Sequence, residues 1–147
     1  MADELKRVSP EEAHRLMTEE GYIYVDVRTE AEWNAGHPVG AHNVPWAHAG
    51  PSGFVPNPEF LPVMQKLYEK NCPMVVGCKS GGRSLKASQA LIAAGYTAVI
   101  DQRAGFEGPR DSFGKLTEPG WSPQGLPVEK ETPGASYAEL KTKASAT

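Results

Sequence analysis

The residues of this chain that are best suited to chemistry lie together in the segment 75–84, which reads VVGCKSGGRS. Cys78 directly follows an apolar run that is typical of a strand buried in a parallel sheet. After it comes a loop with two glycines, which leads into a segment whose apolar residues have helical spacing. Ligands of open α/β sheets bind beyond the carboxyl ends of the strands, and the sequence places Cys78 at such an end.

The composition of this loop favours an anionic sulfur. Its glycines permit tight or left-handed turns, which can direct successive backbone N–H groups inward. The helix expected at 84–94 directs the positive end of its dipole at the same place, and two basic side chains lie close by. These effects favour the thiolate, which is the nucleophilic form of cysteine. We therefore predict that Cys78 is catalytic and that the substrate-binding loop comprises Lys79, Ser80, Gly81, Gly82, Arg83 and Ser84.

The second cysteine, Cys72, lies outside the Gly-rich loop, and we expect a structural role for it. Cys72 and Cys78 stand at opposite ends of a predicted strand, which holds them too far apart for a disulfide. Two free thiols favour a reducing compartment. Residues 1–5 lack the basic and apolar pattern of a secretory signal, so we predict a cytoplasmic protein.

The bulk composition excludes several classes of function. The chain has 147 residues, 39% of them hydrophobic, which suits one compact domain that could be a monomer or a dimer. Its net charge of −3, with acids and bases mixed, predicts no binding to nucleic acid or membranes. No apolar run reaches the roughly 18 residues of a transmembrane helix. No Cys/His cluster has zinc spacing, and we expect neither a metal nor a cofactor.

The segments that must position the loop alternate between strands and helices. Ser9-Pro10-Glu11-Glu12 carries the N-cap, the first-turn proline and the capping-box glutamate of a helix that ends at Gly21. The alternation predicts an α/β domain with helices on both faces of a parallel sheet. The remaining patterns predict strands at 22–27, 42–44, 73–77 and 97–100, and helices at 30–35, 59–70 and 84–94.

Gly- and Pro-rich composition predicts irregular chain at 49–58 and at 103–135. Within the second stretch, the segment 109–123 is expected to cover the core rather than to form a lid. We assign residues 5–130 to the domain and residues 131–147 to a C-terminal tail with a short helix.

Three blocks of the sequence resemble the rhodanese family. The loop 78–84 is similar to that family's active-site loop, and the blocks follow the family's order over about residues 7 to 128. The family's first conserved block is matched by VDVR at 25–28, Glu32-Trp33 and GHPVGAHNVP at 36–45, and its closing elements by AGFEG at 104–108 and GLPV at 125–128. Two departures stand out, because Ala104 replaces a glycine and 109–123 is longer than the expected linker.

The resemblance implies a five-stranded parallel sheet and a sulfurtransferase that works by double displacement. Cys78 would take the outer sulfur of a small anionic donor such as thiosulfate as a persulfide, and would then pass it to cyanide or a thiol. Lys79 and Arg83 would bind the donor and offset its developing charge.

Four residues outside the loop complete the candidate site. The resemblance implies that Asp26 and Arg28 form a structural ion pair beneath it. We place Phe106 and Trp46 at the rim of the pocket, and Phe106 is favoured because it follows the last strand.

Two other functions stay open. Cysteine-based phosphatases and arsenate reductases, as families, place five residues between the cysteine and the arginine, whereas four separate Cys78 from Arg83 here. A persulfide carrier or regulatory module that is fed by a protein partner would use the same cysteine without a small-molecule donor.

Overall fold

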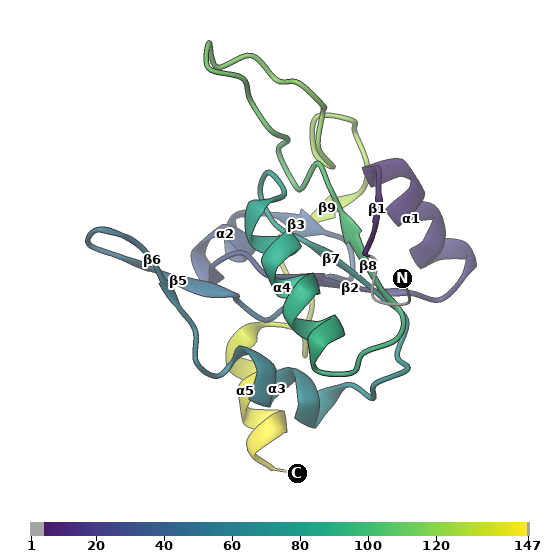
Figure 1. Cartoon of the computed structure of the whole chain (residues 1–147), viewed down its shortest axis with the longest axis vertical. Helices are drawn as coiled ribbons and strands as arrows, with labels where there is room; N and C mark the ends of the chain where they lie inside the picture. Colours follow the sequence, from purple (N-terminus) through teal and green to yellow (C-terminus); the bar gives the residue numbers. More distant parts are fainter. Residues whose placement is uncertain (1–4, 147) are drawn as a thin grey trace.

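The computed structural model describes residues 5–146, so residues 1–4, on which the secretory-signal prediction rests, and Thr147 lie outside the described part. A five-stranded parallel sheet forms the centre, with the strand order β1-β8-β7-β2-β4 (Figure 1). Its strands are β1 (Lys6–Val8), β2 (Ile23–Asp26), β4 (His42–Asn43), β7 (Met74–Gly77) and β8 (Val99–Gln102). The predicted parallel α/β class is confirmed.

Helices cover both faces of the sheet, as predicted (Figure 1). Side chains of successive strand residues point to opposite faces. Tyr24 and Val75 therefore join one buried cluster with Leu16, whereas Val25 and Val76 join the other. The first cluster packs under α1 (Pro10–Glu19), and the second packs under α3 (Phe60–Leu67), α4 (Gly82–Ala93) and α5 (Tyr137–Ser145).

A short helix and a small strand pair complete the sheet edge near β4. Helix α2 (Glu30–Ala35) begins at Thr29, whose side chain and that of Glu32 form the capping box. Strand β3 (His37–Pro38) pairs antiparallel with β9 (Val128–Glu129). No helix in the range 5–146 combines the length and the apolar character that a bilayer span needs.

The prediction of irregular chain at 49–58 is wrong. Strands β5 (Ala47–Gly50) and β6 (Gly53–Pro56) form an antiparallel hairpin there, which projects from the sheet in Figure 1. Gly53 has a φ of +120°, a conformation that glycine adopts without strain. The same glycines and prolines that suggested a loop form the turn and the end of the hairpin, and the pairing of its strands has no local sequence signal.

Trp121 and helix α5, both near the C-terminus, contribute to the core. Trp121 is fully buried against Tyr24, whereas Phe113, in the long loop that projects beyond the sheet in Figure 1, is 93% exposed. Helix α5 lies beside α3, and its Tyr137 hydroxyl accepts a hydrogen bond from Asn57 at 3.1 Å. The segment assigned to a tail from the sequence therefore packs into the same core.

Candidate active site at Cys78

Cys78 directly follows β7, which lies between β8 and β2 in the middle of the sheet. Gly77, the last residue of that strand, packs so closely on Tyr24 that an added Cβ would lie 1.8 Å from the tyrosine hydroxyl oxygen. The strand therefore places Cys78 at the carboxyl edge of the sheet, and the residue before it has no room for a side chain.

One backbone amide of the loop points at the sulfur. The N–H of Gly81 donates to Sγ of Cys78 with an N···S distance of 3.1 Å. Cys78 itself is only 2% exposed. If Cys78 is the nucleophile, backbone N–H groups of the loop should point at its sulfur. A buried sulfur with these N–H groups turned away from it would contradict that role. The sulfur is enclosed, and the Gly81 amide faces it, so the geometry has at least one of the inward-facing amides that this role requires.

Gly81 can adopt this position because it has no side chain. Its φ is +105°, and it precedes the first residue of α4. A Cβ at this position would lie 2.3 Å from the carbonyl oxygen of Arg103. The next glycine, Gly82, is different, because a Cβ there would meet nothing within 4 Å.

The segment after β8 supports the loop from behind. The N–H of Phe106 donates to the carbonyl of Cys78 at 2.7 Å, and the N–H groups of Glu107 and Gly108 donate to the carbonyl of Lys79 at 3.0 and 3.1 Å. Gly105 has a φ of +78°, and an added Cβ would lie 2.4 Å from the Lys79 carbonyl. These contacts leave the Lys79 and Ser80 side chains exposed at the tip.

A buried acid and an arginine that sequence reasoning missed also hold the loop. Arg7 on β1 pairs with Asp101 on β8 at 2.5 Å, and it donates a second hydrogen bond to the Gly81 carbonyl at 3.3 Å. Burial raises the pKa of Asp101, while the hydrogen bond and the charge of Arg7 oppose the change. Asp101 carried a signal, as an acid directly after the strand predicted at 97–100, whereas the strand that bears Arg7 was not predicted.

Arg83 lies next to the loop, but its charge has a partner within the chain. It donates to both carboxylate oxygens of Glu32, and its guanidinium carbon lies 4.3 Å from the centre of the Phe54 ring. Burial alone would raise the pKa of Glu32, but hydrogen bonds from Arg83 and Thr29 lower it to about 2. The two cations expected to bind the donor therefore differ. Arg83 is paired with Glu32, whereas Lys79 forms no ion pair within residues 5–146.

Asp26 and Arg28 form a buried ion pair, with a distance of 2.7 Å between Arg28 Nη2 and Asp26 Oδ2. Arg28 also donates to the Gly36 carbonyl at 2.7 Å, and its guanidinium stacks 4.3 Å from the Phe106 ring centre. Phe106, expected at the pocket rim, therefore packs against this pair.

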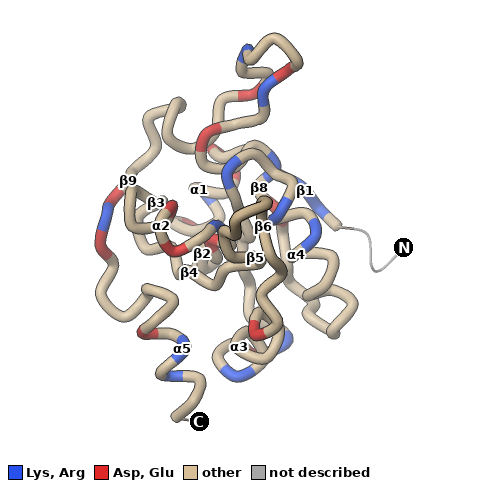
Figure 2. Tube along the Cα trace, turned by 90° about the vertical axis from the view of Figure 1, so that its left-hand side faces the viewer, with Lys and Arg blue, Asp and Glu red and all other residues tan. Residues whose placement is uncertain are grey.

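A cavity of about 380 Å³ lies between the hairpin β5–β6 and the start of α4. Trp46, the other expected rim residue, lines it, and Phe106 does not. Its other lining residues are Ala47, Phe54, Pro56, Gly82, Arg83 and Lys86. In the view of Figure 2, several Lys and Arg positions gather around the labels of β8, β6 and α4.

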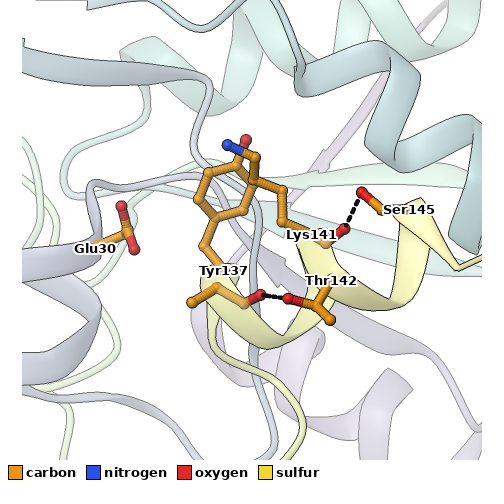
Figure 3. Close-up of a pocket in the computed structure, with 6 residues that line it drawn as sticks. Glu30, Tyr137, Lys141, Thr142 and Ser145 are labelled. Carbon is orange, nitrogen blue, oxygen red and sulfur yellow. Dashed lines mark hydrogen bonds between the residues drawn. The ribbon is translucent and has the colours of Figure 1, made fainter.

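A second cavity, of about 400 Å³, lies along α5 and contains no residue of the Cys78 loop (Figure 3). Three of its polar side chains already have partners within the chain. Lys141 pairs with Glu59 at 3.0 Å, and the hydroxyls of Thr142 and Ser145 donate to carbonyls of their own helix. The geometry therefore favours the Cys78 loop as the site of chemistry.

Residues 9–110 of the chain match the family described as the rhodanese-like domain. Thiosulfate sulfurtransferase 16, chloroplastic, of Arabidopsis thaliana is 38% identical over 122 residues, which cover 83% of this chain and 91% of that protein. Rhodanese-like domain-containing protein 15, chloroplastic, of the same plant is 36% identical over 82% of this chain, which spans 60% of that protein. The crystal structure of Rv0390 from M. tuberculosis has a TM-score of 0.70 at 30% identity, covering 86% of this chain and 98% of that one.

The names of these relatives correct one prediction. The sequence suggested a cytoplasmic protein, whereas both A. thaliana relatives are named chloroplastic. The prediction is wrong because free thiols indicate a reducing environment without identifying the compartment.

Proposed function

Because the chain belongs to the rhodanese-like domain family, a family of sulfurtransferases, we propose that it transfers sulfane sulfur by way of a persulfide on Cys78. Family membership confirms the resemblance recognised in the sequence. The observation that carries the proposal is the Gly81 N–H directed at Sγ of Cys78 at 3.1 Å. A fixed amide dipole at this distance stabilises a thiolate before the reaction and does so again when the thiolate leaves.

Thiosulfate is the proposed donor. In the first step the Cys78 thiolate attacks the outer sulfur, the S–S bond of thiosulfate breaks, and sulfite leaves with the bonding electron pair. In the second step an acceptor thiolate or cyanide attacks the outer sulfur of the persulfide, and Cys78 leaves as a thiolate. Charge and electrons balance in both steps without an oxidant or a reductant.

The two loop cations have different roles in this proposal. Lys79 is exposed at the loop tip and attracts the dianionic donor. Arg83 is held by Glu32 and stacked on Phe54, so it acts as a positioning residue that fixes the first turn of α4. The name of the relative thiosulfate sulfurtransferase 16 supports the choice of donor.

Incubation with thiosulfate followed by intact-mass spectrometry tests the proposal. We expect the wild type to gain the mass of one sulfur atom and Cys78→Ser to gain none. Cys72→Ser is the matched control and should gain the sulfur, because burial and the charge of Glu69 raise the pKa of Cys72. A wild type that gains no mass, or a Cys78→Ser variant that still does, would contradict the proposal. 3-Mercaptopyruvate, with a single negative charge, should load Cys78 less efficiently than thiosulfate.

A further inference from the structure

The cavity beneath the hairpin β5–β6 has an unusual lining for a site that handles inorganic sulfur. Trp46, Ala47, Phe54 and Pro56 form one wall, and the first turns of α4 form the other. Phe54 is 57% exposed although it borders a hollow. The volume of the cavity, about 380 Å³, lies within the range of small-molecule sites.

The cavity adjoins the loop that carries the reactive sulfur. Gly82 and Arg83 line it, and they are the first two residues of α4, directly after the loop that begins at Cys78. Trp46 packs against the buried cluster that contains Cys78. A molecule in this cavity therefore lies beside the loop.

The two basic side chains that line the cavity differ in whether they already have a partner. Arg83 is 13% exposed at its side chain and is occupied by Glu32 and Phe54. Lys86, one turn further along α4, is exposed, and no ion pair is recorded for it within residues 5–146. The cavity thus offers an apolar wall and one available ammonium group.

Resting on the proposed function, we propose that this cavity binds the sulfur acceptor and that the acceptor is a thiol with an apolar body and one carboxylate. Thiosulfate and cyanide have no apolar part that Trp46 and Phe54 could cover. An apolar chain laid on these rings is removed from water, which favours its binding. The carboxylate pairs with Lys86, and the thiolate end reaches the outer sulfur on Cys78.

The transfer itself is balanced. The acceptor thiolate forms a bond to the outer sulfur of the persulfide, and the S–S bond to Cys78 breaks with its electron pair remaining on Cys78. The products are the acceptor persulfide and the Cys78 thiolate.

Single-turnover discharge of the preloaded protein tests this acceptor class. The protein is loaded with thiosulfate, freed of excess donor, checked by mass, and mixed with 6-mercaptohexanoate, 6-mercaptohexanol or 2-mercaptoethanol. We expect the wild type to reach half-maximal rate at the lowest concentration with 6-mercaptohexanoate. Lys86→Gln should raise this concentration about fivefold for 6-mercaptohexanoate only. Phe54→Ala should raise it severalfold for both six-carbon thiols and leave 2-mercaptoethanol unchanged.

Two variants outside the cavity serve as controls. Lys115→Gln removes an exposed lysine of the projecting loop, and Val55→Ala trims the exposed neighbour of Phe54, which does not line the cavity. Both should discharge all three thiols as the wild type does.

Tryptophan fluorescence gives a binding readout that is independent of sulfur chemistry. Trp33 and Trp121 are buried, whereas Trp46 is partly exposed at the cavity, so added hexanoate should change the emission of unloaded protein. Trp46→Phe should abolish that change, and Lys86→Gln should weaken binding about fivefold.

The outcomes separate the two proposals. Failure of Cys78 to load contradicts the proposed function, and hexanoate binding then still tests the cavity. Normal loading with equal discharge of the three thiols, unaffected by Lys86→Gln and Phe54→Ala, would overturn the acceptor site alone. Absence of any fluorescence change with hexanoate would also count against it.

Discussion

Arg83 donates hydrogen bonds to both carboxylate oxygens of Glu32, at 2.8 and 3.1 Å, and so ties the first turn of α4 to the first turn of α2. Glu32 also accepts a hydrogen bond from the N–H of Thr29 as part of its capping box. The Glu32 carboxylate therefore connects the start of α4, which follows the reactive loop, to the start of α2. Because Arg83 is already paired with this carboxylate, it is a poor candidate for direct donor binding.

The Arg83–Glu32 pair makes stability depend on pH in acid. The pKa of Glu32 is about 2 in the folded protein, against about 4.3 in an unfolded chain. Because the folded value is lower, the stabilisation is fully present above about pH 4.5 and is lost as pH falls toward 2. We expect Glu32→Gln to lower the free energy of unfolding by about 1–3 kcal/mol at pH 7. Urea denaturation from pH 7 to pH 3.5 should show the difference from wild type shrinking, whereas exposed Glu131→Gln should show none.

Gly81 and Gly82 form a matched pair for testing the loop geometry. Gly81→Ala places a Cβ in a left-handed conformation and 2.3 Å from the Arg103 carbonyl oxygen. We expect it to lower the free energy of unfolding by at least about 1–3 kcal/mol and to slow persulfide formation, because the amide that faces Sγ is displaced. Gly82→Ala meets open space at the start of α4 and should be neutral or stabilising by about 0.4–1 kcal/mol. Equal effects of the two variants on the loading rate would contradict the role of the Gly81 amide.

Lys79 is expected to act through long-range charge. Lys79→Ala should raise KM for thiosulfate roughly fivefold, which corresponds to about 1 kcal/mol, and should leave kcat nearly unchanged. Added salt should raise KM of the wild type more steeply than KM of the variant, because salt screens the attraction that the variant has lost. Steady-state kinetics at several salt concentrations measure this, with Lys115→Ala as the control. A KM that does not respond to Lys79→Ala would remove this lysine from donor binding.

The Asp26–Arg28 pair should matter for folding. Both side chains are almost fully buried, so Asp26→Ala leaves the Arg28 guanidinium without its carboxylate partner inside the protein. We expect a loss of about 3–5 kcal/mol in the free energy of unfolding. Glu12→Ala, which breaks a surface ion pair with Arg15, should cost much less than Asp26→Ala in the same urea denaturation experiment, because water screens the pair. Similar losses for the two variants would indicate that burial of the Asp26–Arg28 pair carries little energy.

Much of the architecture was predictable because it depends on neighbours in the chain. Ser9 accepts the hydrogen bond from the N–H of Glu12 that its position suggested, and Thr29 and Glu32 form the expected capping box. The Gly-rich loop after β7 turns a glycine amide toward Cys78 because only glycine tolerates the left-handed backbone required at position 81. The alternation of predicted strands and helices along the chain was sufficient to indicate a parallel α/β sheet.

The sequence by itself determined the fold class, the starts of α1 and α2 and the placement of a cysteine at the end of a buried strand, since each follows from residues close together in the chain. Only the tertiary structure decided which charges remain available, because Arg83 meets a carboxylate 51 positions earlier and Arg7 meets one 94 positions later. It also decided that Phe106 stacks on Arg28 and that the hairpin β5–β6 encloses a cavity beside α4. These contacts join segments whose approach is set by packing of the whole sheet, for which local patterns carry no signal.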